Sequence, residues 1–292
     1  MDAKELLKKV RLVELRTKGF VNEIFSGEYH SVFKGRGIEF SEVREYQFGD
    51  DIRLIDWNVS ARFDHPFVKV FEEERELTVM LLVDFSRSSH YGTRNGLKNE
   101  IAVEICACLA FSAIKNNDKV GAILFTDRIE KFIPPKKGKS HILRILRELL
   151  FFEPKGTRTN LKLGLEYFSK VMKKKSITFL ISDFYDTGYE DPLKIVSRRH
   201  DLIAIHLIDP TEKELPKVGL VKFADAESGD DVWVDTGNKE LRKKYSNYWN
   251  ENKKVLEKTL LKSKVDKIEI NIEKSYINPL IDFFKRRGKR FR

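Results

Sequence analysis

The chain has 292 residues, of which 41% are hydrophobic and 34% are charged, and this balance is typical of a soluble globular protein with one large or two modest domains. No segment approaches the roughly 18 uncharged apolar residues of a membrane-spanning helix, and the first residues, MDAKELLKKVRLVEL, lack the apolar centre of a signal peptide, so we expect a cytoplasmic protein. The formal net charge is +10, and residues 238–292 alone hold 17 basic and 7 acidic residues, a net of +10.

Residues 1–76 differ in kind from the rest of the chain. They begin with a predicted helix and continue as a segment rich in charge, glycine and short apolar stretches, without a helical period. We expect an N-terminal helix and a β-rich module here, packed on an α/β domain that covers residues 77–292. Within the module Trp57 is expected to pack structurally rather than stack on a ligand, and Arg44 to pair with a nearby carboxylate.

From Leu77 onward, apolar runs alternate with amphipathic stretches, which is typical of strands and crossover helices around a mostly parallel sheet. The predicted strands cover residues 78–84, 119–126, 129–134, 176–183, 201–209 and 267–272. The predicted helices cover residues 97–117, 139–151, 160–173, 190–199, 238–262 and 276–287. A hairpin insertion is expected near 219–237 and a basic tail at 285–292. The pattern therefore predicts an α/β fold with flanking helices.

Oxygen-bearing side chains follow two of the predicted strands and one loop. Asp84 ends the first strand and opens a D-x-S-x-S pattern with Ser86 and Ser88; Asp183 ends another apolar strand, and Thr159 precedes a helix. Because loops converge at the carboxyl ends of parallel strands, we expect these side chains to lie together. Such oxygen donors suit a hard cation, Mg²⁺ or Mn²⁺. With few carboxylates around it, the ion would keep enough charge to attract a partner's acidic side chain.

Two alternatives stay open at this point. A D-x-S-x-S pattern alone is also compatible with a helix cap or turn, because Asp and Ser side chains satisfy free backbone N–H groups. In the loop, Thr157 competes with Thr159 for the hydroxyl position.

The three-part pattern resembles the metal-ion-dependent adhesion site of von Willebrand factor A-type domains. In that family the two serines and the threonine ligate the metal and the acids act mainly through water. The resemblance therefore implies direct ligation by both serines and by Thr159, and an indirect role for both aspartates. Asn160 and the helix after it match the family pattern and favour Thr159 over Thr157.

The stretches GRGIEF, VREYQFGDD and IDWNVSAR, within residues 29–76, resemble the characteristic segment of the bacterial domain-of-unknown-function family 58. That family couples this segment to a von Willebrand A-like domain. Its members are frequently found with MoxR-type AAA+ ATPases, so the resemblance implies such an ATPase, or its client, as partner. Many relatives carry membrane helices ahead of the segment, and we expect none in this chain.

Together these features predict a non-enzymatic, metal-dependent protein-interaction module, and we assign no catalytic residue. None of the six histidines has zinc-site spacing, and the oxygen cluster has fewer carboxylates than a two-metal hydrolase needs. A metal-dependent hydrolase and a nucleic-acid-binding protein acting through residues 285–292 are the alternatives. The basic segment lacks the interleaved aromatic residues of a recognisable nucleic-acid module, which makes nucleic acid the weaker partner.

Overall fold

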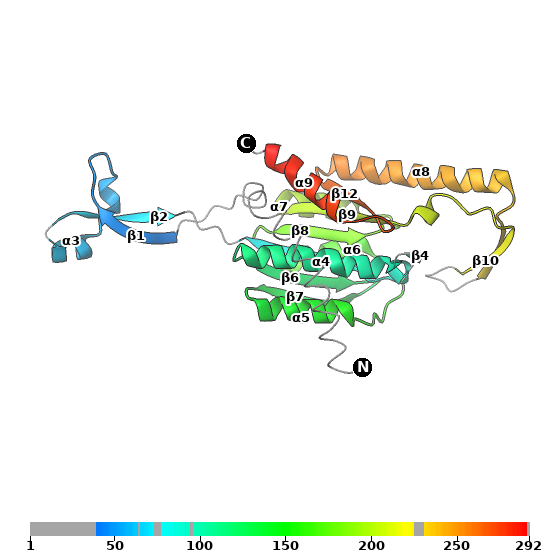
Figure 1. Cartoon of the computed structure of the whole chain (residues 1–292), viewed down its shortest axis with the longest axis horizontal. Helices are drawn as coiled ribbons and strands as arrows, with labels where there is room; N and C mark the ends of the chain where they lie inside the picture. The colour runs from blue at the N-terminus through cyan, green and yellow to red at the C-terminus, as the bar shows by residue number, and fades with distance from the viewer. Residues whose placement is uncertain are drawn as a thin grey trace. The chain divides into compact units, whose positions relative to one another are not determined.

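The structure is a computed structural model that describes residues 39–63, 65–72, 77–90, 92–93, 96–224 and 231–290. The chain divides into two compact units, one formed by Phe33–Leu77 and the other containing Thr78–Arg292 (Figure 1). The predicted N-terminal helix lies outside the described residues. The extent of the two predicted domains, 1–76 and 77–292, stays a prediction.

The first unit is built on an antiparallel strand pair, β1 (Glu39–Glu45) and β2 (Phe67–Glu72). A 3-10 turn, η1 (Ile52–Leu54), and a short helix, α3 (Trp57–Phe63), lie between them in sequence. The Arg44 guanidinium donates hydrogen bonds of 2.8 and 2.7 Å to the two carboxylate oxygens of Asp50, which is the kind of pairing the sequence predicts. The unit is therefore a hairpin with a helical connection.

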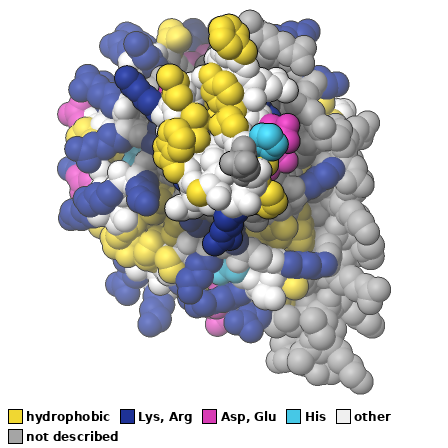
Figure 2. Space-filling view, turned by 90° about the vertical axis from the view of Figure 1, so that its left-hand side faces the viewer, with side chains coloured by type: hydrophobic (Ala, Val, Ile, Leu, Met, Phe, Trp, Pro, Cys, Tyr) yellow, Lys and Arg dark blue, Asp and Glu magenta, His cyan; other side chains and the backbone are white. Residues whose placement is uncertain are grey.

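Large apolar side chains of this unit are exposed to solvent. They are Phe48, Ile52, Leu54, Trp57 and Phe63. Hydrophobic side chains also gather on the face turned to the viewer in Figure 2. The predicted packing role of Trp57 is not found within this unit, because the residue is 68% exposed and helix α3 buries none of its residues.

A six-stranded sheet with the order β12-β9-β8-β3-β6-β7 forms the centre of the second unit. Its strands are β3 (Thr78–Asp84), β6 (Lys119–Phe125), β7 (Ile129–Lys136), β8 (Ile177–Ser182), β9 (Asp201–Ile208) and β12 (Asp266–Asn271). Every neighbouring pair is parallel except β6 and β7, which form an antiparallel edge. This arrangement confirms the predicted α/β fold with a mostly parallel sheet.

Helices cover both faces of the sheet (Figure 1). They are α4 (Lys98–Lys115), α5 (Lys139–Leu150), α6 (Leu161–Val171), α7 (Glu190–Arg199), α8 (Lys239–Lys262) and α9 (Ile277–Arg290). Met80 and Leu82 of β3 pack in one core with apolar residues of α6, α7 and α8. The alternate β3 residues Leu81 and Val83 are equally buried and face the other side, as period-2 alternation requires. No helix in the described part of the chain is long and apolar enough to cross a membrane.

The remaining parts of the second unit are short. The predicted hairpin near 219–237 is formed by the antiparallel strands β10 (Leu220–Ala224) and β11 (Asp231–Asp235). The 3-10 turns η2 (Arg87–His90) and η3 (Pro210–Glu212) lie after β3 and β9, and β4 (Gly92–Thr93) pairs with β5 (Gly96–Leu97).

The predicted basic tail at 285–292 needs correction. Residues up to Arg290 continue helix α9, because Phe283 and Phe284 bury its apolar side. Arg287 is only 7% exposed, and its guanidinium pairs with Asp201 and Asp266. At least one of the basic residues in this segment therefore belongs to the folded domain.

Candidate functional site

The two predicted aspartates lie side by side at the carboxyl edge of the sheet. Strand β3 ends at Asp84, and the neighbouring parallel strand β8 ends one residue before Asp183. Both carboxylates are buried. The Ser182 hydroxyl links the two strand ends by donating a 2.7 Å hydrogen bond to Asp84 Oδ2. Topology thus brings together acids that are 99 residues apart in sequence.

The turn after β3 fixes the two serines. The Ser86 N–H donates to Asp84 Oδ1 at 2.9 Å, and the Ser86 and Ser88 hydroxyl oxygens lie 2.9 Å apart. The Phe85 N–H donates to the Phe125 carbonyl at 2.9 Å, which ties the turn to strand β6. Ser88 lies near enough to Asp183 to help lower the pKa of that carboxyl group. The D-x-S-x-S pattern therefore forms an ordered turn whose hydroxyls face both acids.

A second loop brings the threonine to this turn. The Thr159 hydroxyl donates to Ser86 Oγ at 2.8 Å. Thr157 contributes its backbone instead, because its carbonyl accepts the Arg87 N–H at 3.0 Å. Asn160 caps helix α6 with its side chain, which fixes the loop just after Thr159. Of the two threonines that the sequence leaves open, Thr159 is the one whose hydroxyl reaches the serines.

Glu130 of strand β7 holds the same loop through hydrogen bonds. Glu130 Oε1 accepts the Gly156 N–H at 2.7 Å and the Lys155 N–H at 3.0 Å, and it also accepts the Thr126 hydroxyl at 2.9 Å. A Cβ added to Gly156 would lie 2.0 Å from Thr126 Oγ1 and 2.0 Å from Asp127 Oδ1. The close approach of the loop to β6 and β7 therefore requires glycine at position 156.

Gly156→Ala is expected to displace the loop that carries Thr159. The new methyl group overlaps the buried Thr126, and relieving such an overlap costs about 1–3 kcal/mol of unfolding free energy. If the site binds Mn²⁺, a displaced Thr159 should also weaken that binding by about tenfold, as disturbed support of a metal site does. Urea unfolding and calorimetric Mn²⁺ titration measure the two effects. Lys155→Ala is the control, since its side chain is exposed and its N–H is kept; equal losses in both variants would contradict the prediction.

A buried lysine joins the site, and sequence reasoning missed it. Lys98 is the first residue of α4, and its side chain is 1% exposed. Its ammonium donates to Asp183 Oδ2 at 2.9 Å and to Glu212 Oε1 at 2.5 Å, and it lies 5.9 Å from the centre of the Tyr185 ring. The sequence held one signal: a lysine at a predicted helix start, where the helix dipole disfavours a cation.

The two aspartates have opposite electrostatic environments. Burial, together with the negative charge of Asp183, raises the pKa of Asp84 to about 7. Burial also acts to raise the pKa of Asp183, but the charge and hydrogen bond of Lys98 outweigh it and lower the pKa of Asp183 below its ordinary value. Asp183 and Glu212 both pair with the Lys98 ammonium, and Asp84 adds a third buried carboxyl group beside Asp183. An added cation would balance the remaining negative charge.

The donor set fits a small hard cation only if the hydroxyls take part. Within the described ranges, no three carboxylate, imidazole or thiol groups gather closely enough to hold a metal by themselves. The hydroxyl oxygen of Ser86 lies 2.9 Å from that of Ser88 and 2.8 Å from that of Thr159. In an octahedral Mg²⁺ site with ligands at about 2.1 Å, neighbouring oxygens lie about 3.0 Å apart. The Ser86 hydroxyl therefore lies from each of the other two at the spacing of adjacent ligands, which is also the distance at which the hydroxyls hydrogen-bond to one another.

The backbone next to Asp183 is strained. Phe184 has a φ of 59°, a left-handed conformation that bulky residues rarely adopt. It is held there by a 3.0 Å hydrogen bond from its N–H to the Ser182 hydroxyl and by burial of its ring. Strained residues of this kind cluster at binding and catalytic sites, where the surrounding structure maintains them.

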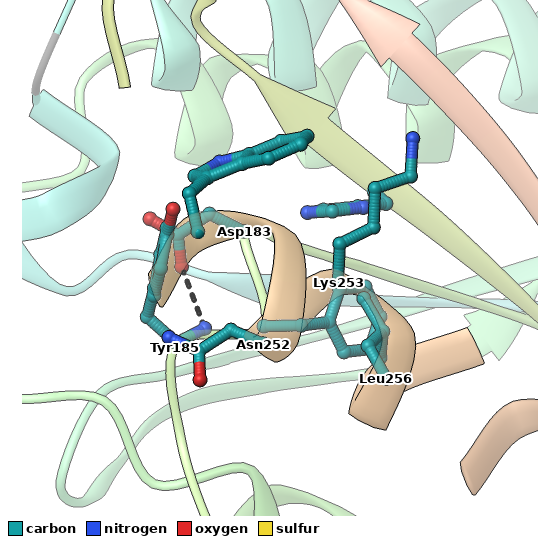
Figure 3. Close-up of a pocket in the computed structure, with 8 residues that line it drawn as sticks. Asp183, Tyr185, Asn252, Lys253 and Leu256 are labelled. Atoms are coloured by element: carbon teal, nitrogen blue, oxygen red, sulfur yellow. Dashed lines mark hydrogen bonds between the residues drawn. The ribbon is translucent and has the colours of Figure 1, made fainter. Parts of the chain in front are cut away.

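A small cavity adjoins Asp183 on the side of helix α8 (Figure 3). Its volume is about 30 Å³, and Tyr185, Asn252 and Lys253 are among the residues that line it. His206 also lines it, and burial lowers the pKa of this imidazole to about 4, so it is neutral at physiological pH. A cavity of this size accommodates ordered water rather than an organic ligand.

Comparisons with known proteins cover most of the chain. A family model described as "Protein of unknown function DUF58" matches residues 42–255. "Uncharacterized protein Rv1480" of Mycobacterium tuberculosis is 32% identical over 232 residues, which cover 78% of this chain and 73% of that protein. The crystal structure of BatB from Bacteroides thetaiotaomicron is similar with a TM-score of 0.48 and 13% identity, over 73% of this chain and 99% of that one. A mussel byssus protein, PTMP1, with a zinc-occupied MIDAS motif, gives a TM-score of 0.36 and 17% identity, over 45% of this chain and 38% of that one.

Proposed function

Because the chain belongs to the DUF58 family and has a von Willebrand A-like fold, we propose that it is a protein-interaction module whose binding site is completed by a divalent metal ion. The observation that carries the proposal is the row of three hydroxyl oxygens, spaced 2.8 and 2.9 Å apart, beside two buried carboxylates. The row lies at the carboxyl edge of a mostly parallel sheet, where ligands bind in open α/β sheets.

In this proposal the hydroxyls of Ser86, Ser88 and Thr159 hold Mg²⁺ or Mn²⁺ directly. Asp84 and Asp183 hold ordered water around the ion, because their oxygens already accept hydrogen bonds from the chain. Bound there, the ion supplies a strong positive charge that attracts a carboxylate oxygen. Neutral hydroxyl ligands do not reduce that charge as carboxylates would, so the site favours an acidic side chain of a partner.

The partner that we propose is a MoxR-type AAA+ ATPase or its client, in the cytoplasm. The resemblance of the N-terminal segment supports this choice, and the exposed apolar side chains of the first unit, such as Phe48 and Trp57, offer a second contact surface. The proposed role is that of an adaptor, which binds and does not transform its partner.

A capture experiment with matched threonine variants tests the proposal. The full chain is immobilised and offered a purified MoxR-type ATPase from the same organism, in Mg²⁺ or in EDTA. We expect EDTA to abolish capture and Thr159→Ala to weaken it at least tenfold, since loss of one supporting group typically costs a metal site about 10–100-fold. Thr157→Ala should bind like the wild type, because Thr157 meets the serine turn through its carbonyl.

Two outcomes would contradict the proposal. Capture that is unchanged in EDTA would remove the metal from the mechanism. Equal losses in Thr157→Ala and Thr159→Ala would mean that the loop matters only as a whole and that the Thr159 hydroxyl has no special role.

A further inference from the structure

The buried ammonium of Lys98 has no evident structural purpose in helix α4. As the first residue of that helix, it lies where the helix dipole repels a cation. Its side chain is 1% exposed, and burying a charge is costly unless it is paired. A leucine or methionine at this position would avoid both costs but would leave Asp183 and Glu212 without their cation, so the ion pairs themselves explain the presence of a lysine.

Both carboxylate oxygens of Asp183 accept hydrogen bonds, one from Lys98 and one from the chain that follows β8. Oδ2 accepts the ammonium at 2.9 Å, and Oδ1 accepts the Tyr185 N–H at 3.4 Å (Figure 3). Glu212, at the end of η3, completes the environment of Lys98 and is itself held by the Asp209 N–H at 3.2 Å. The lysine is thus fixed between two acids that come from different strand ends.

We propose that Lys98 is a positioning residue that withholds the charge of Asp183 from the metal ion, so that the ion keeps its affinity for an acidic group of the partner. The inference rests on the proposed metal site. An aspartate free of Lys98 would turn toward the ion and neutralise part of its charge. Lys98 therefore weakens metal binding and strengthens capture of a carboxylate.

If Lys98 has this role, a single variant should change the affinity for Mn²⁺ and the affinity for an acidic probe in opposite directions. Lys98→Met combined with Glu212→Gln removes one positive and one negative charge, so the net charge of the site is unchanged while Asp183 loses its partner. We expect Mn²⁺ to bind at least about tenfold tighter, because attraction between close charges is strong at a buried site. We expect the Mn²⁺-loaded variant to bind an acidic probe at least about tenfold more weakly than the loaded wild type. A merely structural role would weaken both.

The experiment measures both affinities on the full chain. Mn²⁺ binding is followed by calorimetry, and the acidic probe is a fluorescein-labelled hexaglutamate peptide followed by anisotropy at saturating Mn²⁺. Lys162→Met is the matched control, because Lys162 is an exposed lysine of helix α6 and its loss removes a charge without freeing an acid of the site. Circular dichroism checks that each variant is folded. If the double variant unfolds, Glu212→Gln alone replaces it, because this variant keeps the pair between Lys98 and Asp183. Glu212→Gln should then bind Mn²⁺ more weakly than the wild type and keep peptide binding.

The possible failures are distinguishable. If the wild type binds no Mn²⁺, the proposed function and this inference both fall. If the wild type binds Mn²⁺ and the peptide, but the double variant shows unchanged or weaker Mn²⁺ affinity, only the role of Lys98 is overturned. Changes of equal size in Lys162→Met would also overturn it, since they would reduce the effect to general surface charge.

Discussion

Replacing Asp84 and Ser86 together by alanine is expected to abolish Mg²⁺ and Mn²⁺ binding, with a loss of at least about 100-fold in affinity. Ser86 occupies the middle of the row of hydroxyls, within 2.9 Å of Ser88 and 2.8 Å of Thr159. Asp84 orients that serine by accepting its N–H and links β3 to β8 by accepting the Ser182 hydroxyl. The double variant therefore loses a ligand, a water-holding acid and the contact that fixes the turn.

Calorimetric titration with Mn²⁺ measures this loss. Ser197→Ala is a suitable control, because Ser197 lies in helix α7 and hydrogen-bonds only to the Lys194 carbonyl among the described residues. We expect the fold of the double variant to persist, since the apolar core beneath the site is untouched, and circular dichroism checks this. Unchanged Mn²⁺ affinity in a folded double variant would refute the assignment of the site.

Arg287→Ala is expected to lower stability more than replacement of the exposed basic residues of helix α9, which are Lys285, Arg286 and Lys289. The Arg287 side chain is 8% exposed, and its guanidinium pairs with Asp201 and Asp266 at the starts of β9 and β12 and lies 5.7 Å from the centre of the Phe283 ring. Removing one partner of a buried ion pair costs about 3–5 kcal/mol. Because both aspartates are partly exposed and regain water, we expect about 2–3 kcal/mol, or a Tm about 4–12 °C lower.

Thermal unfolding measures the effect, and Lys285→Ala is the control because that side chain is exposed on the same helix. The pairs lie at the amino ends of the strands, opposite the candidate site, so Mn²⁺ affinity should not change in either variant. A Tm equal to that of the wild type would show that Arg287 does not hold α9 to the sheet. The result also bears on nucleic-acid binding, since a buried, paired arginine cannot contact phosphate without opening the fold.

The parts of the structure that the sequence predicted share a local signal. Strand β3 is a continuous apolar run that ends in Asp84, and β8 is another that ends in Ser182 and Asp183, so each strand and its polar end could be read within seven or eight residues. One general rule, that loops meet at the carboxyl edge of a parallel sheet, then places Asp84 beside Asp183. The structure confirms that proximity, while metal binding by these residues stays a prediction.

The parts that escaped prediction depend on partners far away in sequence. Lys98 interacts with Asp183 and Glu212, which are 85 and 114 residues away, and apart from its position at the start of a helix nothing near Lys98 indicates either contact. Arg287 looks like one more charge in a basic run until strands β9 and β12 bring two aspartates to it. The prediction for Trp57 failed within its unit for a local reason. An aromatic residue suggests burial in a core, and the short helix α3 does not provide one.

The candidate site is built from segments that are far apart in the sequence, and this has a consequence for folding. The hydroxyl contact between Thr159 and Ser86 spans 73 residues, and the contact between Ser182 and Asp84 spans 98. Such distant contacts form only after long loops have closed, late in assembly of the sheet. A partly folded chain, or a proteolytic fragment that lacks the end of β3 or the end of β8, therefore has an incomplete site. Occupancy by metal would therefore favour the complete fold by mass action and distinguish finished molecules from unfinished ones.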